Sequence, residues 1–216
     1  MSDTPETESL LQAVAARYGG LAARPEANLS CGGALDLASP GPGDVVVDLG
    51  CGRGKDVLRA AALVGPAGQA IGVDASEEML ARARAALPAG TTNARFLRGD
   101  LAALPLPPAC ASLVTSNCAI NHAPDKAAVY REIHRVLRAG GRVVVSDVVS
   151  EEALPESVRL DPAAWAACYG GAIPEADYLA AIRAAGFRDV EVLRRTAPYE
   201  KGGVRVLSVT VKGIRP

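Results

Sequence analysis

The sequence has no excess of positive charge. Its 216 residues include 23 Lys and Arg against 24 Asp and Glu, which gives a formal net charge of −1. Nucleic acids and anionic membrane surfaces usually bind to a basic face of a protein. We therefore expect neither kind of partner.

The sequence also lacks the features of export and of membrane insertion. No apolar run approaches the length of about 20 residues that a membrane-spanning helix needs. The first residues, MSDTPETESLL, are acidic, whereas a secretory signal peptide begins with basic residues. These absences predict a cytoplasmic protein, in a compartment that keeps thiols reduced.

A disulfide framework is absent as well. The cysteines are odd in number and scattered along the chain, at Cys31, Cys51, Cys110, Cys118 and Cys168. A disulfide-stabilised protein usually has an even number of cysteines at characteristic spacings. Any chemistry of these side chains is therefore expected to be that of thiols or thiolates.

The composition and the order of the apolar runs indicate one α/β domain. Hydrophobic residues make up 49% and charged residues 22%, and a chain of this length can bury a stable core. Short β-branched runs alternate with helical segments, which is typical of a parallel sheet with crossover helices. The expected strands are 45–49, 70–74, 95–98, 112–116 and 142–147, and the helices between them are 55–63, 76–87 and 126–137.

The two ends of the chain complete this pattern. Apolar spacing predicts an amphipathic helix over 4–18. A helix over 176–185 precedes two further strands, near 190–193 and 204–211, which we expect to pair antiparallel at one edge of the sheet. The predicted fold is a doubly wound, mostly parallel seven-stranded sheet with helices on both faces.

A glycine-rich loop follows the first strand, in Asp48-Leu49-Gly50-Cys51-Gly52-Arg53-Gly54. Glycines at a strand-to-helix junction let the backbone approach a ligand closely. The loop lacks the G-x-G-x-x-G spacing that suits a diphosphate, and its first residue is an acid, which suits an ammonium group. Asp74 ends the next strand, where its carboxylate can accept hydrogen bonds from ribose hydroxyls.

The third and fourth strands bring further polar residues to the same edge. Asp100, in Gly99-Asp100-Leu101, is suited to accept a hydrogen bond from an adenine amine. The alternative is that these acids are only turn and cap residues of an α/β protein that binds no nucleotide. The residues expected to contact a cofactor are Asp48, Gly50, Cys51, Gly52, Gly54, Asp74, Ala75, Asp100, Leu101 and Asn117.

These motifs resemble those of the class I S-adenosylmethionine methyltransferases, a Rossmann-like family. Residues 48–54 resemble the first motif of the family, and Asp74 and Asp100 its ribose and adenine acids. Residues 137–141 resemble its Leu-x-Pro-Gly-Gly turn, with Ala139 in place of proline. The resemblance covers residues 45–195 and implies S-adenosylmethionine as cofactor. We expect the chain to form one domain, 1–216. Its parts are an N-terminal helix and lid (1–43), a cofactor-binding core (44–147), a substrate-side insertion (148–175) and a C-terminal helix with strands (176–216).

The five cysteines differ in whether they can reach this edge. Cys51 lies inside the glycine loop, where the backbone matters more than the side chain, and Cys110 precedes the fourth strand at the opposite end. Cys118 follows the fourth strand directly, Cys168 lies in the insertion, and Cys31 lies in the N-terminal lid. Each alone is more often a small buried apolar residue. Three that converge on one edge suggest a site for a soft metalloid.

A closer resemblance is carried by these cysteine segments. Ser116-Asn117-Cys118-Ala119-Ile120-Asn121 and Trp165-x-x-Cys168-x-Gly-Gly-Ala are similar to segments of the arsenite methyltransferases, and Cys31 is similar in position to a third cysteine. The family implies that Cys31, Cys118 and Cys168 are the catalytic residues that bind trivalent arsenic, without a metal cofactor. It also implies a thiol reductant such as glutathione or thioredoxin.

The two histidines have less certain roles in this comparison. His122 stands where the family usually has an aliphatic residue, and it is either a polar contact in the pocket or an exposed residue at a helix start. His134 is expected on a solvated helix face. The function implied is methyl transfer from S-adenosylmethionine to thiolate-bound arsenic. Two alternatives stay open: methylation of a small organic acceptor (a quinone, polyketide or thiol), and metalloid binding without catalysis.

Overall fold

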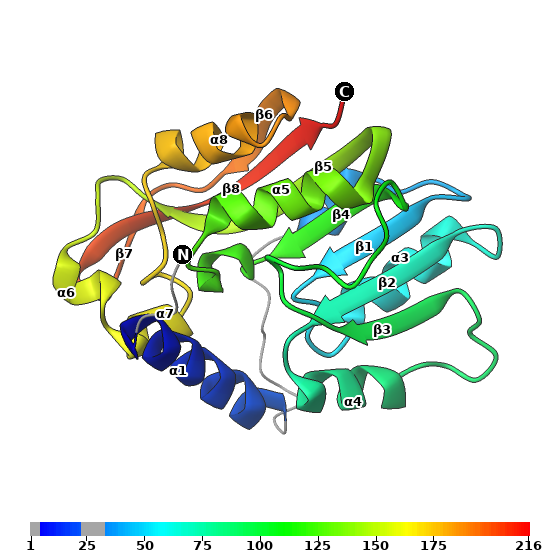
Figure 1. The fold of residues 1–216 in the computed structure, drawn as a ribbon, viewed down its shortest axis with the longest axis horizontal. Coiled ribbons are helices and arrows are strands. Elements are labelled where there is room, and N and C mark those ends of the chain that lie inside the picture. Colours follow the sequence, from blue (N-terminus) through cyan, green and yellow to red (C-terminus); the bar gives the residue numbers. More distant parts are fainter. Residues whose placement is uncertain (1–4, 23–32) are drawn as a thin grey trace.

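The computed structural model describes residues 5–22 and 33–216, which are built around one eight-stranded sheet (Figure 1). Seven strands follow the order β3-β2-β1-β4-β5-β8-β6, and the short β7 pairs with β8 beside this path. Their bounds are β1 (Val45–Leu49), β2 (Gln69–Asp74), β3 (Ala94–Arg98), β4 (Ala111–Asn117), β5 (Leu137–Ser150), β6 (Arg188–Arg195), β7 (Tyr199–Lys201) and β8 (Val204–Ile214).

The sheet is mostly parallel. Strands β1 to β5 pair parallel, and β8 runs antiparallel between β5 and β6. This confirms the predicted doubly wound fold and its antiparallel addition, although β8 lies inside the sheet and only β6 forms the edge. The short β7 ends at Lys201, and Gly202 and Gly203 make the turn to β8 with φ angles of +60° and +77°.

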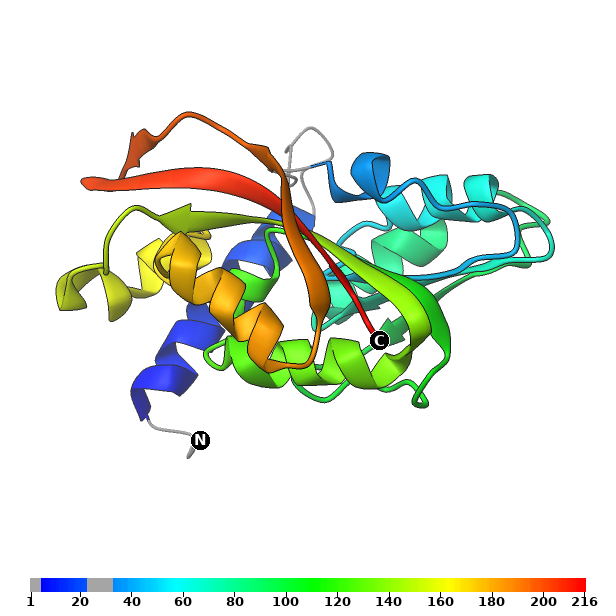
Figure 2. The same ribbon diagram turned by 90° about the horizontal axis from the view of Figure 1, so that it is seen from above.

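Helices cover both faces of the sheet (Figure 2). One face packs on α2 (Ala34–Ala38), α3 (Lys55–Val64) and α4 (Glu77–Ala85), and the other on α5 (Lys126–Val136) and α8 (Glu175–Ala184). Successive strand residues point to opposite faces. Val46 therefore belongs to the first core, and Val47 and Leu49 belong to the second.

The helix ends follow from local side chains. Ser76 caps α4, because its hydroxyl accepts a hydrogen bond from the amide of Met79 at 3.2 Å. Helix α5 was expected over 126–137 and is one residue shorter. The helix ends at Val136, because Leu137 is buried and already pairs with Ala111 of β4.

The remaining helices lie at the carboxyl ends of the parallel strands. They are α1 (Pro5–Ala22), the short η1 (Ile120–His122), α6 (Glu156–Arg159) and α7 (Pro162–Ala166). Helix α1 packs against α7 and α4, so it lies across the edge where the strands end (Figure 1). No helix in the described parts of the chain is long and apolar enough to cross a membrane.

Candidate functional site

A cleft of about 1530 Å³ opens at the carboxyl ends of the parallel strands. In open α/β sheets this edge is the usual ligand site. The cleft is bounded by α1, the glycine loop, the ends of β2 and β3, and η1. All the residues expected to contact a cofactor line it, with the exception of Gly54.

The glycines of the loop serve different purposes. Gly50 has a φ of +66°, and a Cβ there would lie 2.3 Å from the Cβ of Ala119. Gly52 has a φ of +52°, and a Cβ there would meet nothing within 4 Å. At Gly54 a Cβ would collide with the Phe96 ring at 2.6 Å. Gly54 is therefore needed for packing, whereas Gly52 leaves the backbone open to the cleft.

Three carboxyl groups gather at one end of the cleft, which we call the acidic end (Asp48, Asp56 and Asp74). Asp74 accepts hydrogen bonds from the amides of Gly52 at 2.8 Å and Ser76 at 2.9 Å. Burial raises its pKa, and these two amides oppose that effect. The acid that sequence reasoning placed at the end of β2 is thus held in a fixed orientation at the cleft wall.

Asp48 is the most buried acid of this group. Its side chain is only 6% exposed and accepts a hydrogen bond from the Thr115 hydroxyl at 2.9 Å. Burial, together with the nearby Asp56 and Asp74, raises its pKa to about 7. A cation bound at this end would relieve the repulsion among the three carboxylates.

The other predicted cofactor residues are spread along the cleft. Asn117 links two helices, since its side chain donates to Asp56 at 3.0 Å and accepts from the amide of Ala34 at 3.1 Å. Asp100 is exposed and accepts a hydrogen bond from the amide of Ala102 at 2.9 Å. The Cys51 thiol belongs to the core that covers α3, and burial raises its pKa.

The opposite end of the cleft is lined by Tyr18, Cys118 and His122. Cys168 lies behind this wall and contacts Tyr18 and His122, and we call these four residues the thiol end. Cys118 directly follows β4 and is 3% exposed, and Cys168 follows α7 and is 8% exposed. Both have left-handed backbones, with φ angles of +55° and +67°. Such conformations are uncommon for residues other than glycine and occur often at functional sites.

Tyr18, His122 and Cys168 form a triangle of close polar contacts. The Tyr18 hydroxyl lies 3.1 Å from Nε2 of His122 and 3.2 Å from Sγ of Cys168, and this Sγ lies 3.2 Å from the same Nε2. Burial lowers the pKa of His122 to about 4, so the imidazole is neutral at pH 7. His122 is therefore a contact of the pocket, which settles the two interpretations of its sequence position.

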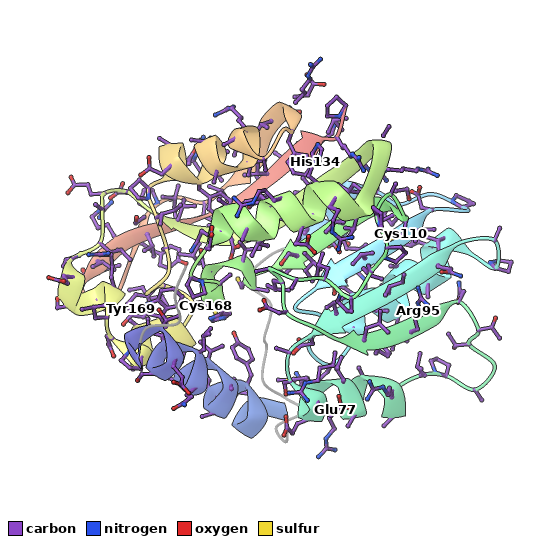
Figure 3. The ribbon with its side chains drawn as sticks, in the orientation of Figure 1. Glu77, Arg95, Cys110, His134, Cys168 and Tyr169 are labelled. Atoms are coloured by element: carbon purple, nitrogen blue, oxygen red, sulfur yellow. The ribbon has the colours of Figure 1, made fainter. Side chains whose placement is uncertain are left out.

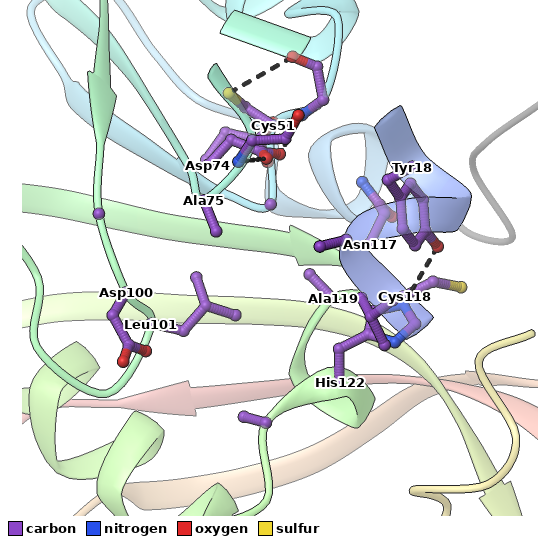
Figure 4. Close-up of a pocket in the computed structure, with 18 of the residues that line it drawn as sticks. Tyr18, Cys51, Asp74, Ala75, Asp100, Leu101, Asn117, Cys118, Ala119 and His122 are labelled. Carbon is purple, nitrogen blue, oxygen red and sulfur yellow. Dashed lines mark hydrogen bonds between the residues drawn. The ribbon is translucent and has the colours of Figure 1, made fainter. Parts of the chain in front are cut away.

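Cys118 lies beside the same triangle. Burial raises the pKa of Tyr18, and the Cys168 and Cys118 thiols raise it further. Figure 4 shows Tyr18, Cys118 and His122 together on one side of the pocket, away from Asp74. Sequence reasoning treated Tyr18 only as an apolar position of the N-terminal helix and missed this role.

Glycines and an asparagine hold the Cys168 segment against η1. The Asn121 side chain donates to the carbonyls of Val148 at 2.6 Å and Cys168 at 3.4 Å. A Cβ at Gly171 would lie 2.0 Å from the Asn121 carbonyl oxygen, so only glycine permits this approach. The sequence Cys168-x-Gly-Gly therefore packs the cysteine segment closely against Asn121.

Three residues from the sequence analysis remain: the predicted arsenic ligand Cys31, Cys110 and His134. Cys31 lies outside the described residues. Cys110 precedes β4 at its amino end and is far from Cys168 (Figure 3). His134 was expected on a solvated face, but it is half-buried and its ring packs edge-on against Phe187, with centroids 5.3 Å apart. Within residues 5–22 and 33–216, no three His, Cys, Asp or Glu side chains are close enough together to hold a metal ion.

Known proteins resemble this chain in both sequence and fold. The profile of a family described as a methyltransferase domain matches residues 40–197. An arsenite methyltransferase of Halobacterium salinarum is 41% identical over 165 residues, which are 76% of this chain and 42% of that protein. One of Aquipseudomonas alcaligenes is 40% identical over 152 residues, 67% of this chain and 44% of that protein. The chain thus spans less than half the length of these curated relatives.

A solved structure matches nearly the whole chain. It is an arsenic(III) S-adenosylmethionine methyltransferase from Chlamydomonas reinhardtii, with a TM-score of 0.76 and 31% sequence identity. The match covers 98% of this chain and 74% of that structure. The matched part of this chain includes both the acidic end and the thiol end of the cleft.

Proposed function

This chain belongs to the methyltransferase-domain family, and we propose that it transfers a methyl group from S-adenosylmethionine to trivalent arsenic held by cysteine thiolates. The observation that carries the proposal is that one cleft has an acidic end and, opposite it, a buried cysteine, Cys118, with the buried Cys168 in contact with the lining residues Tyr18 and His122. The relatives named as arsenite methyltransferases support the same choice of substrate.

The acidic end fits the charge of S-adenosylmethionine. The cofactor carries a sulfonium and an ammonium group, and a buried carboxyl such as Asp48 is costly to ionise without a nearby cation. Asp74 is fixed by two backbone amides and keeps lone pairs for ribose hydroxyls. The open space above Gly52 leaves room for the ligand next to the backbone.

The thiol end fits a soft electrophile. Trivalent arsenic prefers thiolate ligands to oxygen ligands, as soft metal ions do. Cys118 and Cys168 are the described candidates, and Cys31 is the proposed third ligand. Three thiolates would hold arsenic as a pyramid whose lone pair points away from the sulfurs.

For this reaction the protein mainly has to align the arsenic lone pair with the methyl group. When bound, S-adenosylmethionine supplies an electrophilic methyl group. The arsenic lone pair carries no proton, so no side chain has to act as a general base. Cys118 and Cys168 would aim that lone pair along the cleft, and such alignment can lower a barrier by about 7–11 kcal/mol. The transfer would break the sulfonium–methyl bond, release S-adenosylhomocysteine and raise arsenic from the trivalent to the pentavalent state. A thiol reductant such as glutathione or thioredoxin, in a reducing cytoplasm, would supply the two electrons that return arsenic to the trivalent state, and would itself become a disulfide.

A direct assay tests the proposal. The protein is incubated with labelled S-adenosylmethionine, glutathione and arsenite, in parallel with quinone, polyketide and thiol acceptors. We expect methylated arsenic as the product. Transfer to an organic acceptor alone would overturn the choice of substrate, and arsenite binding without turnover would indicate a metalloid-binding protein instead.

A further inference from the structure

The mechanism above uses Cys168 but gives no part to Tyr18 and His122, the two side chains that contact its sulfur. We propose that Tyr18 and His122 are positioning residues: they hold the Cys168 thiol in its binding orientation and lock helix α1 onto the segment 162–172. This rests on the proposed function, because it assigns Cys168 to the capture of arsenic.

The first step of the argument concerns the freedom of the Cys168 side chain. A thiol on a single Cβ can rotate among three staggered positions, and only one of them can point toward a given ligand. Here the sulfur has two polar neighbours, each within about 3.2 Å, from two different elements. Two such contacts select one rotamer before the ligand arrives, which reduces the entropy lost on binding.

The second step concerns the origin of the two partners. His122 ends η1, only four residues after Cys118, so it ties Cys168 to the position of the other cysteine. Tyr18 comes from α1, which packs on α7 immediately before Cys168. The rings of Tyr18 and His122 also meet edge-on, with centroids 5.2 Å apart. The triangle therefore joins three segments that are far apart in the sequence.

The third step concerns the chemistry of His122. Its Nε2 lies 3.2 Å from Sγ of Cys168 and 3.1 Å from the Tyr18 hydroxyl, so the ring can share a hydrogen bond with either group. An aliphatic side chain, which the resembling family usually has here, could fill the space but could not orient sulfur. His122 thus gives this chain a polar contact to Cys168 that its family resemblance does not predict.

The chain contains its own reporter for the test. Trp165 is the sole tryptophan and lies three positions before Cys168. Its fluorescence is followed while sodium arsenite is added to the full chain without S-adenosylmethionine. We expect His122→Leu and Tyr18→Phe each to weaken arsenite binding about three- to tenfold, the loss of one hydrogen bond. His122→Gln keeps a polar contact and should recover part of the affinity.

A matched control and a second measurement separate positioning from damage. Tyr199→Phe makes the same change on the exposed strand β7 and should leave arsenite binding unchanged. Calorimetry should show S-adenosylmethionine binding at the wild-type affinity in every variant. Hydrogen exchange without arsenite should be faster over 162–172 in His122→Leu and Tyr18→Phe, and unchanged in Tyr199→Phe.

The outcomes distinguish this inference from the proposed function. If the wild type binds arsenite and both variants bind it equally well, the positioning role is wrong. If exchange over 162–172 is the same in all proteins, the lock on α1 is wrong. If the wild type does not bind arsenite at all, the proposed function fails together with this role in capture, whatever the exchange shows.

Discussion

The acidic end of the cleft is built mostly from one short stretch of chain, whereas the thiol end is assembled from distant segments. Asp48, Gly50, Gly52 and Asp56 lie within nine consecutive positions, around the junction of β1 and α3. At the thiol end, by contrast, Tyr18 and Cys168 are 150 positions apart and touch through their side chains.

The difference affects how each end holds its shape. The acidic end is fixed by the backbone, through strand pairing, positive-φ glycines and amide hydrogen bonds to Asp74. The thiol end depends on side chains that meet across elements, so one substitution can loosen it without disturbing the sheet. We therefore expect variants of the two ends to separate cofactor binding from substrate chemistry.

The largest effect should come from removing a sulfur. Cys118→Ser and Cys168→Ser should each lower arsenite methylation on the order of a hundredfold or more, because a hydroxyl is a poor ligand for a soft centre and misalignment adds to the loss. S-adenosylmethionine binding, followed by calorimetry, should stay intact. Cys110→Ser, at the far end of β4, is the matched control and should behave like the wild type. Full activity of either serine variant would contradict the thiolate mechanism.

The complementary change removes Asp74, the acid that we propose binds the ribose. Asp74→Ala should weaken S-adenosylmethionine binding by about 1.5–3 kcal/mol, the value of hydrogen bonds to a charged group. Arsenite binding, read from Trp165 fluorescence, should not change. An unaltered affinity for S-adenosylmethionine would mean that the ribose lies elsewhere.

A third variant addresses the point where the two ends meet. A Cβ at Gly50 would collide with Ala119, the neighbour of Cys118. Gly50→Ala should therefore lower the free energy of unfolding by about 1–3 kcal/mol and weaken both ligands. Gly43→Ala, at a φ of +82° and with open space around its Cβ, shows the cost of a positive φ without a collision. Equal losses in the two variants would show that the collision is unimportant.

The smallest effect is a pH dependence at the acidic end. Because the Asp48 pKa is raised to about 7, binding a cation there should release a proton. Affinity for S-adenosylmethionine should then rise about tenfold from pH 6 to pH 8 and level off above that. In Asp48→Asn the rise should disappear. Calorimetry in buffers of different ionisation enthalpy measures the released proton directly.

The contrast between the two ends also explains what the sequence could predict. The alternation of strands and helices and the motif at residues 48–54 are local patterns, and both the fold and the resemblance to class I methyltransferases are confirmed. The position of β8 inside the sheet depends on long-range pairing, which no local pattern contains. Tyr18 was missed for the same reason, since its apolar helical spacing does not show which side chains its hydroxyl will meet.

The left-handed backbones of Cys118 and Cys168 have an evolutionary consequence. A non-glycine residue in this conformation costs about 1–2 kcal/mol, so each cysteine makes the fold less stable than glycine would at the same position. Glycine or asparagine at either position would relieve that strain. In a lineage that no longer meets arsenic, we therefore expect these two cysteines to be lost early, while the glycines of the first loop persist.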